Sequence, residues 1–169
     1  MKFIMTAFTN LELSLKILAV AEDGFLRREH IKDGESITWQ SGQSLVVLPD
    51  RTFNTDEDFI LALQNNVQIA FGAAAITLDV CRQEIGLELP DPIITEQDQV
   101  VALIYQIRCC FAHDIAEPRW VIRGQRYKRI YDLGYKQIDL TNLDGKHFEY
   151  DDIGGLDTLE VMRIRLIGH

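Results

Sequence analysis

The chain has 169 residues, 47% of them hydrophobic, so it is long enough to bury a full core as one domain. Its formal net charge of -9 disfavours non-specific binding to duplex DNA, because the molecule as a whole repels phosphate. Its three cysteines have no CxxC spacing and its first residues have no basic segment before a long apolar run, which predicts a reduced, cytoplasmic protein.

The first third of the chain predicts one helix and one hairpin. A capping box formed by Thr9 and Glu12, followed by apolar residues at helical spacing, predicts a helix over 9–31, which Gly24 bends or ends. Two short apolar-rich runs within 36–48 meet at a Ser-Gly-Gln turn. This composition is typical of two antiparallel strands.

A longer helix is predicted over 55–86. Its first turn is acidic, and apolar residues then recur every three or four positions. The run from Gly72 to Ala75 leaves a smooth patch that another helix can approach closely, either within the chain or as a dimer seam. The most apolar run, 69–78, is too short to span a bilayer, so we expect a buried helix and no membrane partner.

A third helix is predicted over 95–117, before Pro118. Thr95 and Asp98 form a capping box, and apolar residues repeat at helical spacing behind it. Two prolines in the preceding linker make a stiff turn, which sends this helix back antiparallel to the second one as a long helical hairpin.

The last turns of this predicted helix hold Arg108, Cys109 and His113, the candidate catalytic residues. Residues five apart on an ideal helix point about 140° apart, so Arg108 and His113 converge only through the long arginine side chain or a distorted helix end. Cys109 shares the face of His113.

Arginine, four intervening residues and histidine near a helix C-terminus resemble the HEPN family, small all-helical domains of which many are metal-independent ribonucleases. The resemblance is clear over 106–113 and looser over 55–120. It implies a homodimer in which two Arg108 and His113 pairs face one cleft. It also implies RNA cleavage by 2′-hydroxyl attack, with His113 as general acid or base, Arg108 stabilising the phosphoryl oxygens, and a 2′,3′-cyclic phosphate product.

The same three residues also suit roles outside RNA cleavage. Arg108 serves equally as a salt-bridged or surface residue, and His113 suits the negative end of a helix dipole. Cys109 could act as a thiolate nucleophile with His113 as its base. Alternatively, Cys109 and Cys110 fill space in the core. The family usually has Asn, Asp or His where this chain has Cys109, which favours a non-catalytic module that binds a nucleotide or a regulatory partner protein, as in a toxin–antitoxin or defence system.

A basic and aromatic stretch follows the motif. Trp120, Tyr127 and Tyr131 alternate with basic residues, and no acidic residue lies between Glu117 and Asp132. Basic groups neutralise phosphates and aromatic faces stack on unpaired bases, so this stretch predicts single-stranded RNA binding. A strand with solvated charges is the alternative. The predicted RNA-binding residues are Arg119, Arg123, Arg126, Lys128 and Arg129.

The remaining sequence predicts small β additions over 125–150, including a hairpin around Asp144 and Gly145, and a C-terminal helix over 157–167 capped by Asp157. No P-loop, dinucleotide fingerprint or zinc spacing occurs, so we expect no cofactor and no metal. The expected fold is mainly α: a single HEPN-like domain over 1–169, built as an antiparallel helical bundle around a long central helical hairpin, with small β-hairpin additions.

Overall fold

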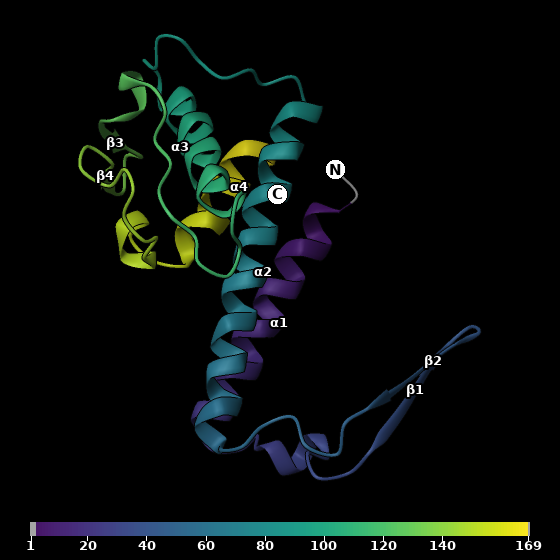
Figure 1. The fold of residues 1–169 in the computed structure, drawn as a ribbon. Helices are drawn as coiled ribbons and strands as arrows, with labels where there is room; N and C mark the ends of the chain where they lie inside the picture. The colour runs from purple at the N-terminus through teal and green to yellow at the C-terminus, as the bar shows by residue number, and fades with distance from the viewer. Residues whose placement is uncertain (1–2, 169) are drawn as a thin grey trace. The chain divides into compact units, whose positions relative to one another are not determined.

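The computed structural model describes residues 3–168, and over these residues the fold is mainly α, as predicted (Figure 1). The helices are α1 (Ile4–Glu22), α2 (Asp56–Glu84), α3 (Glu96–Phe111) and α4 (Asp157–Ile167), and the strands are β1 (Ile37–Ser41), β2 (Ser44–Leu48), β3 (Ile130–Asp132) and β4 (Gln137–Asp139). Short 3-10 turns lie at η1 (Arg28–Ile31), η2 (Gln125–Tyr127) and η3 (Tyr150–Ile153). The strands form two separate antiparallel pairs, β1 with β2 and β3 with β4.

The described chain divides into two compact units. The larger unit comprises 3–11 and 68–168, and the smaller unit comprises 12–67. Helices α1 and α2 contribute residues to both units, whereas α3, α4, β3 and β4 belong to the larger one and β1 and β2 to the smaller one.

Helix α1 begins earlier than predicted and stops short of residue 31, near Gly24, where the sequence predicted a bend or an end. It begins at Ile4, so Thr9 lies inside it and the capping box predicted there is wrong. It ends at Glu22 because Gly24 adopts a positive φ of 78° and the amides of Phe25 and Leu26 both donate to the carbonyl of Val20. Residues 28–31 form the separate turn η1.

The predicted N-termini of α2 and α3 are confirmed. The amide of Asp58 donates to Thr55 Oγ1 at 3.1 Å, and the amide of Asp98 donates to Thr95 Oγ1 at the same distance. The Asp98 carboxylate in turn accepts from the amides of Thr95 and Ile94, and these hydrogen bonds lower the pKa of Asp98. Both caps depend only on residues within four positions of each other.

Helix α3 ends at Phe111, six residues before the predicted end, so His113 lies outside it. The Asp114 carboxylate accepts hydrogen bonds from the amides of Ala116 and Glu117, which fixes a turn just beyond the helix. The amide of Arg119 then donates to the carbonyl of Cys110 and satisfies part of the helix end.

The smooth patch on α2 is covered by side chains of the same chain. A Cβ at Gly72 would lie 2.6 Å from Phe111 Cδ1 and 2.9 Å from Ile115 Cγ1, and Ala74 and Ala75 are fully buried. The patch therefore provides packing inside the larger unit and is not available as a dimer seam.

The hairpin predicted around Asp144 and Gly145 is wrong. Strand β4 pairs instead with β3, in the register Ile130↔Asp139 and Tyr131↔Ile138. Asp144 accepts a hydrogen bond from the amide of Ile122, and the amide of Gly145 donates to the carbonyl of Trp120. These contacts with a distant segment replace the local hairpin that the turn residues favour.

The predicted C-terminal helix is confirmed as α4. Leu159 and Met162 are buried, and Leu166 is half-buried. Asp157 is the first helical residue rather than the cap, because Leu156 occupies the N-cap position and no side chain caps the helix.

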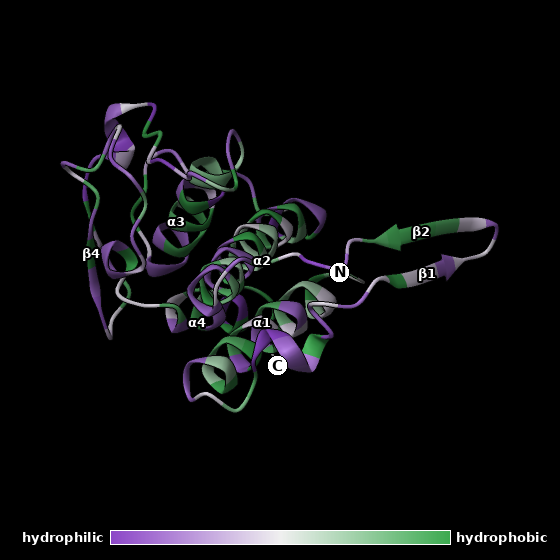
Figure 2. Ribbon diagram, turned by 60° about the horizontal axis from the view of Figure 1, so that its bottom comes forward, coloured by the Kyte–Doolittle hydropathy of each residue, from purple (hydrophilic) through white to green (hydrophobic). Residues whose placement is uncertain are grey.

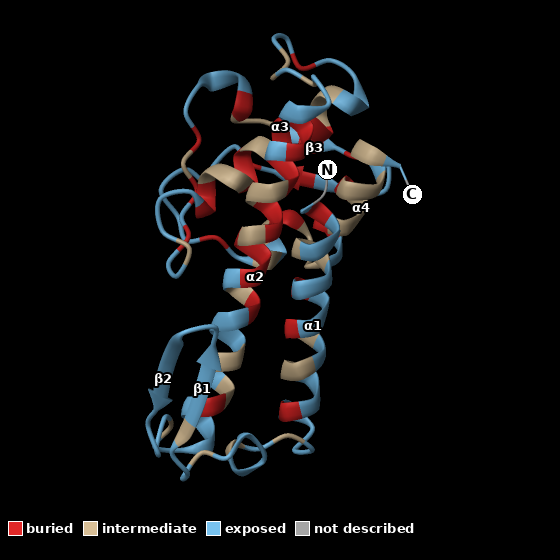
Figure 3. Ribbon diagram, turned by 90° about the vertical axis from the view of Figure 1, so that its right-hand side faces the viewer, coloured by how far each residue is buried: buried red, intermediate tan, exposed pale blue. Residues whose placement is uncertain are grey.

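Most of the buried hydrophobic residues lie in the larger unit. Its aromatic rings pack with centroid separations from 4.9 to 5.7 Å, and the buried faces of α2 and α3 are hydrophobic (Figures 2 and 3). The rings of this aromatic cluster are those of Phe71, Phe111, Trp120, Phe148 and Tyr150. Burial raises the pKa of Tyr150 to about 12. This packed core supports α3 and the turn that follows it.

Candidate functional site

The end of α3 opens into a pocket of about 260 Å³ in the larger unit. All three predicted catalytic residues and one predicted RNA-binding residue line it. The lining residues are Tyr105, Arg108, Cys109, His113, Val121 and Arg123.

The early end of α3 allows Arg108 and His113 to reach one pocket. Because Ala112 is the C-cap, His113 is not held in the direction that a continued helix would impose. The chain then turns at Asp114 and returns past the helix, which brings Val121 and Arg123 to the same pocket. The five-residue spacing of Arg108 and His113 required either a long reach of the arginine side chain or a helix that does not continue regularly to His113. The structure has the second arrangement.

A buried carboxylate holds Arg108. Asp79 of α2 is 2% exposed, and its Oδ2 lies 4.0 Å from Nε of Arg108. Arg82 donates from Nε to Asp79 Oδ1 at 2.8 Å, and Gln83 donates from Nε2 to Oδ2 at 2.9 Å. This separation is longer than a hydrogen bond and 40% of the Arg108 side chain stays exposed, so the carboxylate attracts the guanidinium and leaves it accessible.

The two adjacent cysteines differ in environment. Cys110 is buried and its Sγ donates to the carbonyl of Gln106, and burial raises the pKa of its thiol far above the ordinary value. Cys109 is half-buried and lines the pocket, where its hydrogen bond with Tyr105 is the largest cause of a raised pKa of Tyr105.

The five predicted RNA-binding residues separate into two groups. Arg119 and Arg123 are exposed, and Arg123 reaches the pocket. The other three are engaged within the protein: Arg126 pairs with Asp91 and donates to Tyr127, Lys128 pairs with Asp144 at 2.9 Å, and Arg129 donates to the carbonyl of Ile93 at 2.9 Å.

The predicted aromatic stacking surface is wrong. Trp120, Tyr127 and Tyr131 are 1%, 4% and 0% exposed, so their faces are not available to unpaired bases. Trp120 donates from Nε1 to Asp152 at 2.8 Å, and the hydroxyl of Tyr131 donates to the carbonyl of Tyr127 at 3.2 Å. These rings pack the core beneath the loop.

Sequence reasoning missed two residues of the site. Tyr105 precedes Cys109 by four positions and His113 by eight, so its helical spacing was a usable signal for a shared face. Asp79 is an acidic residue between Leu78 and Cys81 on the apolar stripe of α2, with Arg82 three positions later. A charged residue on a buried stripe indicates a paired charge, because an unpaired one is too costly to bury.

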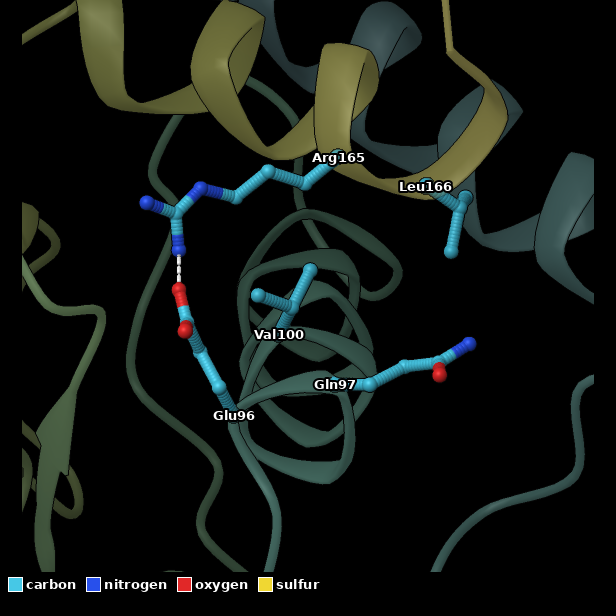
Figure 4. A pocket seen from close by; sticks show the side chains of 5 residues that line it. All are labelled: Glu96, Gln97, Val100, Arg165 and Leu166. Carbon is cyan, nitrogen blue, oxygen red and sulfur yellow. Dashed lines mark hydrogen bonds and ion pairs between the residues drawn. The ribbon is translucent and has the colours of Figure 1, made fainter.

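A second pocket, of about 320 Å³, lies between the start of α3 and the end of α4 (Figure 4). Arg165 pairs with Glu96 across it and also lies 5.0 Å from the centre of the Tyr135 ring. Because Arg165 is already paired, this pocket attracts anions less than the pocket at the end of α3. Among residues 3–168 no group of three or more His, Cys, Asp or Glu side chains is placed to hold a metal ion.

Comparison of the chain with protein-family models, with curated proteins and with solved structures gives no match. The resemblance to the HEPN family therefore rests on the motif residues. By length and composition, α1 and α2 are each apolar enough to cross a membrane, a test that core helices of soluble proteins also pass.

Proposed function

We propose that the protein is a HEPN-like, metal-independent endoribonuclease that cuts single-stranded RNA in the cytoplasm. The observation that carries the proposal is the shared pocket of Arg108, His113 and Arg123, which has no acidic side chain among the described residues that line it. Two guanidinium groups attract a phosphodiester, and histidine exchanges protons near neutral pH.

In the proposed reaction the 2′-oxygen of a ribose forms a bond to the neighbouring phosphorus, and the bond from phosphorus to the 5′-oxygen breaks. The 2′-hydroxyl proton passes to a base and the 5′-oxygen receives a proton, so the products are a 2′,3′-cyclic phosphate and a 5′-hydroxyl. His113 carries a proton in one of these transfers, and Arg108 stabilises the negative charge on the phosphoryl oxygens.

Asp79 acts in this scheme as a positioning residue. Its carboxylate is held by Arg82 and Gln83 and lies against Arg108, so it orients the guanidinium without touching the substrate. A pocket of about 260 Å³ is at the small end of ligand sites and suits one phosphodiester with part of its sugar. Arg123 adds a second cation for that phosphate.

The resemblance also leads us to propose that the protein works as a two-fold dimer whose Arg108 and His113 pairs face one cleft. Two copies of His113 would then serve the two proton transfers, one as base and one as acid.

A non-catalytic module is the second candidate. It is favoured by Cys109, which lines the pocket where the family usually has a polar residue, and by the burial of the three aromatic rings that follow. In that case the same cations bind a nucleotide or an acidic segment of a regulatory protein without cutting RNA.

The test is cleavage of a mixed-sequence single-stranded RNA in excess EDTA. Arg108→Ala and His113→Ala should each lower the rate by about 10² to 10⁴, because each removes a group that acts in the transition state. Arg51→Ala is the matched control, since Arg51 is exposed, is not a predicted RNA-binding residue and does not line this pocket, and it should cut within a few-fold of the wild-type rate. End-group analysis should find the cyclic phosphate.

Binding measured on the same proteins separates the two candidates. Wild-type protein that binds RNA or nucleotide through Arg123 but leaves RNA uncut would contradict the ribonuclease and support the module. Cys109→Asn restores the usual polar motif residue, so a gain of cleavage in that variant would identify Cys109 as the reason for inactivity.

A further inference from the structure

The β1–β2 hairpin of the smaller unit has no covering layer among residues 3–168. Every residue of β2 is exposed, and in β1 only Ile37 is partly covered (Figure 3). The pairing is regular, from Ile37↔Leu48 to Ser41↔Ser44. An isolated two-stranded hairpin is marginally stable in water, so this hairpin is well formed but lacks the packing that normally supports one.

The register gives the hairpin two chemically different faces. Cross-strand partners share a face and successive residues alternate, so Trp39 and Val46 lie on one face together with Leu48. We name this the Trp39 face. The opposite face carries Leu45 and Val47 opposite Gln40 and Thr38, so each of its apolar residues is paired with a polar one. Figure 2 shows the hydrophobic character of β2.

The Trp39 face is apolar and open. Trp39 is 56% exposed, and Val46 and Leu48 are 43% and 44% exposed. The three side chains of this face leave on the order of 300 Å² of apolar surface uncovered, against the roughly 800 Å² that each partner of a standard interface buries. The Trp39 face thus supplies the apolar centre of an interface rather than its whole area.

Charge indicates which partner fits. Residues 36–49 contain no charged side chain, although the chain as a whole carries a net charge of -9. In a two-fold interface a residue near the axis meets its own copy, so a charged segment would repel itself there. An uncharged segment avoids that repulsion. It also has no lysine or arginine to hold anionic headgroups, which argues against a lipid surface as the partner.

We propose that two copies of this chain associate through the β1–β2 hairpin, with the Trp39 face of one copy packed against the Trp39 face of its partner. Two small sheets stacked about 10 Å apart interdigitate their inward side chains, and tryptophan is a residue type that frequently anchors such contacts. The motif resemblance places the Arg108 and His113 pairs of the two copies at one cleft but does not name the β1–β2 hairpin as a contact, and this proposal does not depend on RNA cleavage.

The experiment compares two valines that are neighbours in β2 and lie on opposite faces. Val46→Thr places a hydroxyl inside the proposed seam twice, once per copy, and should raise the dimer dissociation constant roughly 10-fold or more. Val47→Thr makes the same chemical change on the other face and should leave the constant within about threefold. Both variants keep a β-branched residue, so strand propensity is matched.

Sedimentation velocity over a concentration series gives the dissociation constants. Wild-type protein should be dimeric at micromolar concentration, and Trp39→Ala should be monomeric with unchanged circular dichroism, because the anchor is lost and no monomer core is opened. Since the chain has two tryptophans, Trp120→Phe leaves Trp39 as the sole emitter, and its fluorescence should shift to shorter wavelength as the dimer forms.

Three results would overturn the proposal: a wild-type protein that stays monomeric, a dimer that survives Trp39→Ala, or equal effects of the two valine variants. A monomer that co-sediments with phosphatidylcholine vesicles would also overturn it and would assign the face to lipid. RNA cleavage is read on the same variants. A dimer that depends on Trp39 but cuts no RNA supports this surface and contradicts the ribonuclease, whereas a dimer that cuts RNA and survives Trp39→Ala does the reverse.

Discussion

The two tryptophans show how differently the two units use their hydrophobic residues. Trp120 of the larger unit is 1% exposed, and its indole N–H is satisfied by Asp152. Trp39 of the smaller unit is 56% exposed on a two-stranded hairpin. A hairpin alone encloses nothing, whereas helices and loops stacked in layers enclose a core. The same residue type is therefore a core residue in one unit and a surface residue in the other.

Charged residues follow the same division. Arg82 and Asp79 form a buried pair in the larger unit, with side chains 5% and 3% exposed. In the smaller unit Lys16 and Glu12 pair at the surface, with side chains 69% and 64% exposed. Exposed pairs contribute about 0–1 kcal/mol, whereas breaking a buried pair is costly. We therefore expect most of the folding free energy to reside in the larger unit.

The largest difference should appear when the tryptophans are truncated. Trp120→Ala should lower the free energy of unfolding by about 3–5 kcal/mol, because it opens a cavity in the aromatic cluster and leaves Asp152 without its indole partner. Trp39→Ala should change monomer stability by less than about 0.5 kcal/mol. Urea unfolding at a concentration below dimer formation measures both. Similar losses in the two variants would contradict the contrast between the units.

Asp79→Asn tests the buried pair and should cost about 2–4 kcal/mol, because it leaves Arg82 with an uncompensated charge in the core. Glu12→Gln, which removes the surface partner of Lys16, is the control and should leave the urea and thermal midpoints essentially unchanged. Thermal and urea unfolding report both changes. An Asp79→Asn variant with an unchanged free energy of unfolding would show that the carboxylate is not needed for folding.

Two glycines allow a smaller comparison. Gly72→Ala should cost about 1–3 kcal/mol through overpacking, since the added Cβ meets Phe111, and the double variant with Phe111→Leu should recover part of that loss. Gly42→Ala meets no neighbour within 4 Å but sits at a φ of 58°, so it should cost about 1 kcal/mol through backbone strain alone. Phe111→Leu should recover none of the stability that Gly42→Ala loses.

Alkaline pH should affect the larger unit selectively, with no effect near neutrality. Burial raises the pKa of Tyr150 to about 12 and also raises the pKa of Tyr131 above its ordinary value. A raised pKa means that the folded state holds the proton more tightly. Its stabilising contribution is therefore complete below pH 10 and is lost as the pH rises from about 10 to 12.

Urea midpoints measured across that pH range should fall, and Tyr150→Phe should flatten the slope. The smaller unit contains no tyrosine, so its fluorescence, read from Trp39 in a Trp120→Phe background, should not follow this titration directly. A pH dependence unchanged by Tyr150→Phe would exclude this hydroxyl as its source.

The candidate site was partly predictable. Arg108, Cys109, His113 and Arg123 were identified from spacing and charge, and all four line the pocket. Tyr105 and Asp79 were missed. The pairing of Arg126, Lys128 and Arg129 with Asp91, Asp144 and Ile93 was not predictable, because each partner is 16 or more positions away along the chain.

Local interactions are what the sequence by itself determined in this protein. The caps at Thr55 and Thr95, the end of α1 at Gly24 and the tight β1–β2 turn each depend on groups a few positions apart, so a short window contains the whole cause. The mainly α fold class follows from the same short windows.

At other positions, tertiary contacts overruled the local preferences. Helix α3 stops at Phe111, where the amide of the returning Arg119 satisfies the carbonyl of Cys110, and this stop lets His113 line one pocket with Arg108. The Asp144 carboxylate accepts a hydrogen bond from the amide of Ile122, and the turn does not close a hairpin. Tertiary structure also determined burial. Hydrophobicity indicates which side chains are more stable when buried, but the packing of the layers determines which of them are buried.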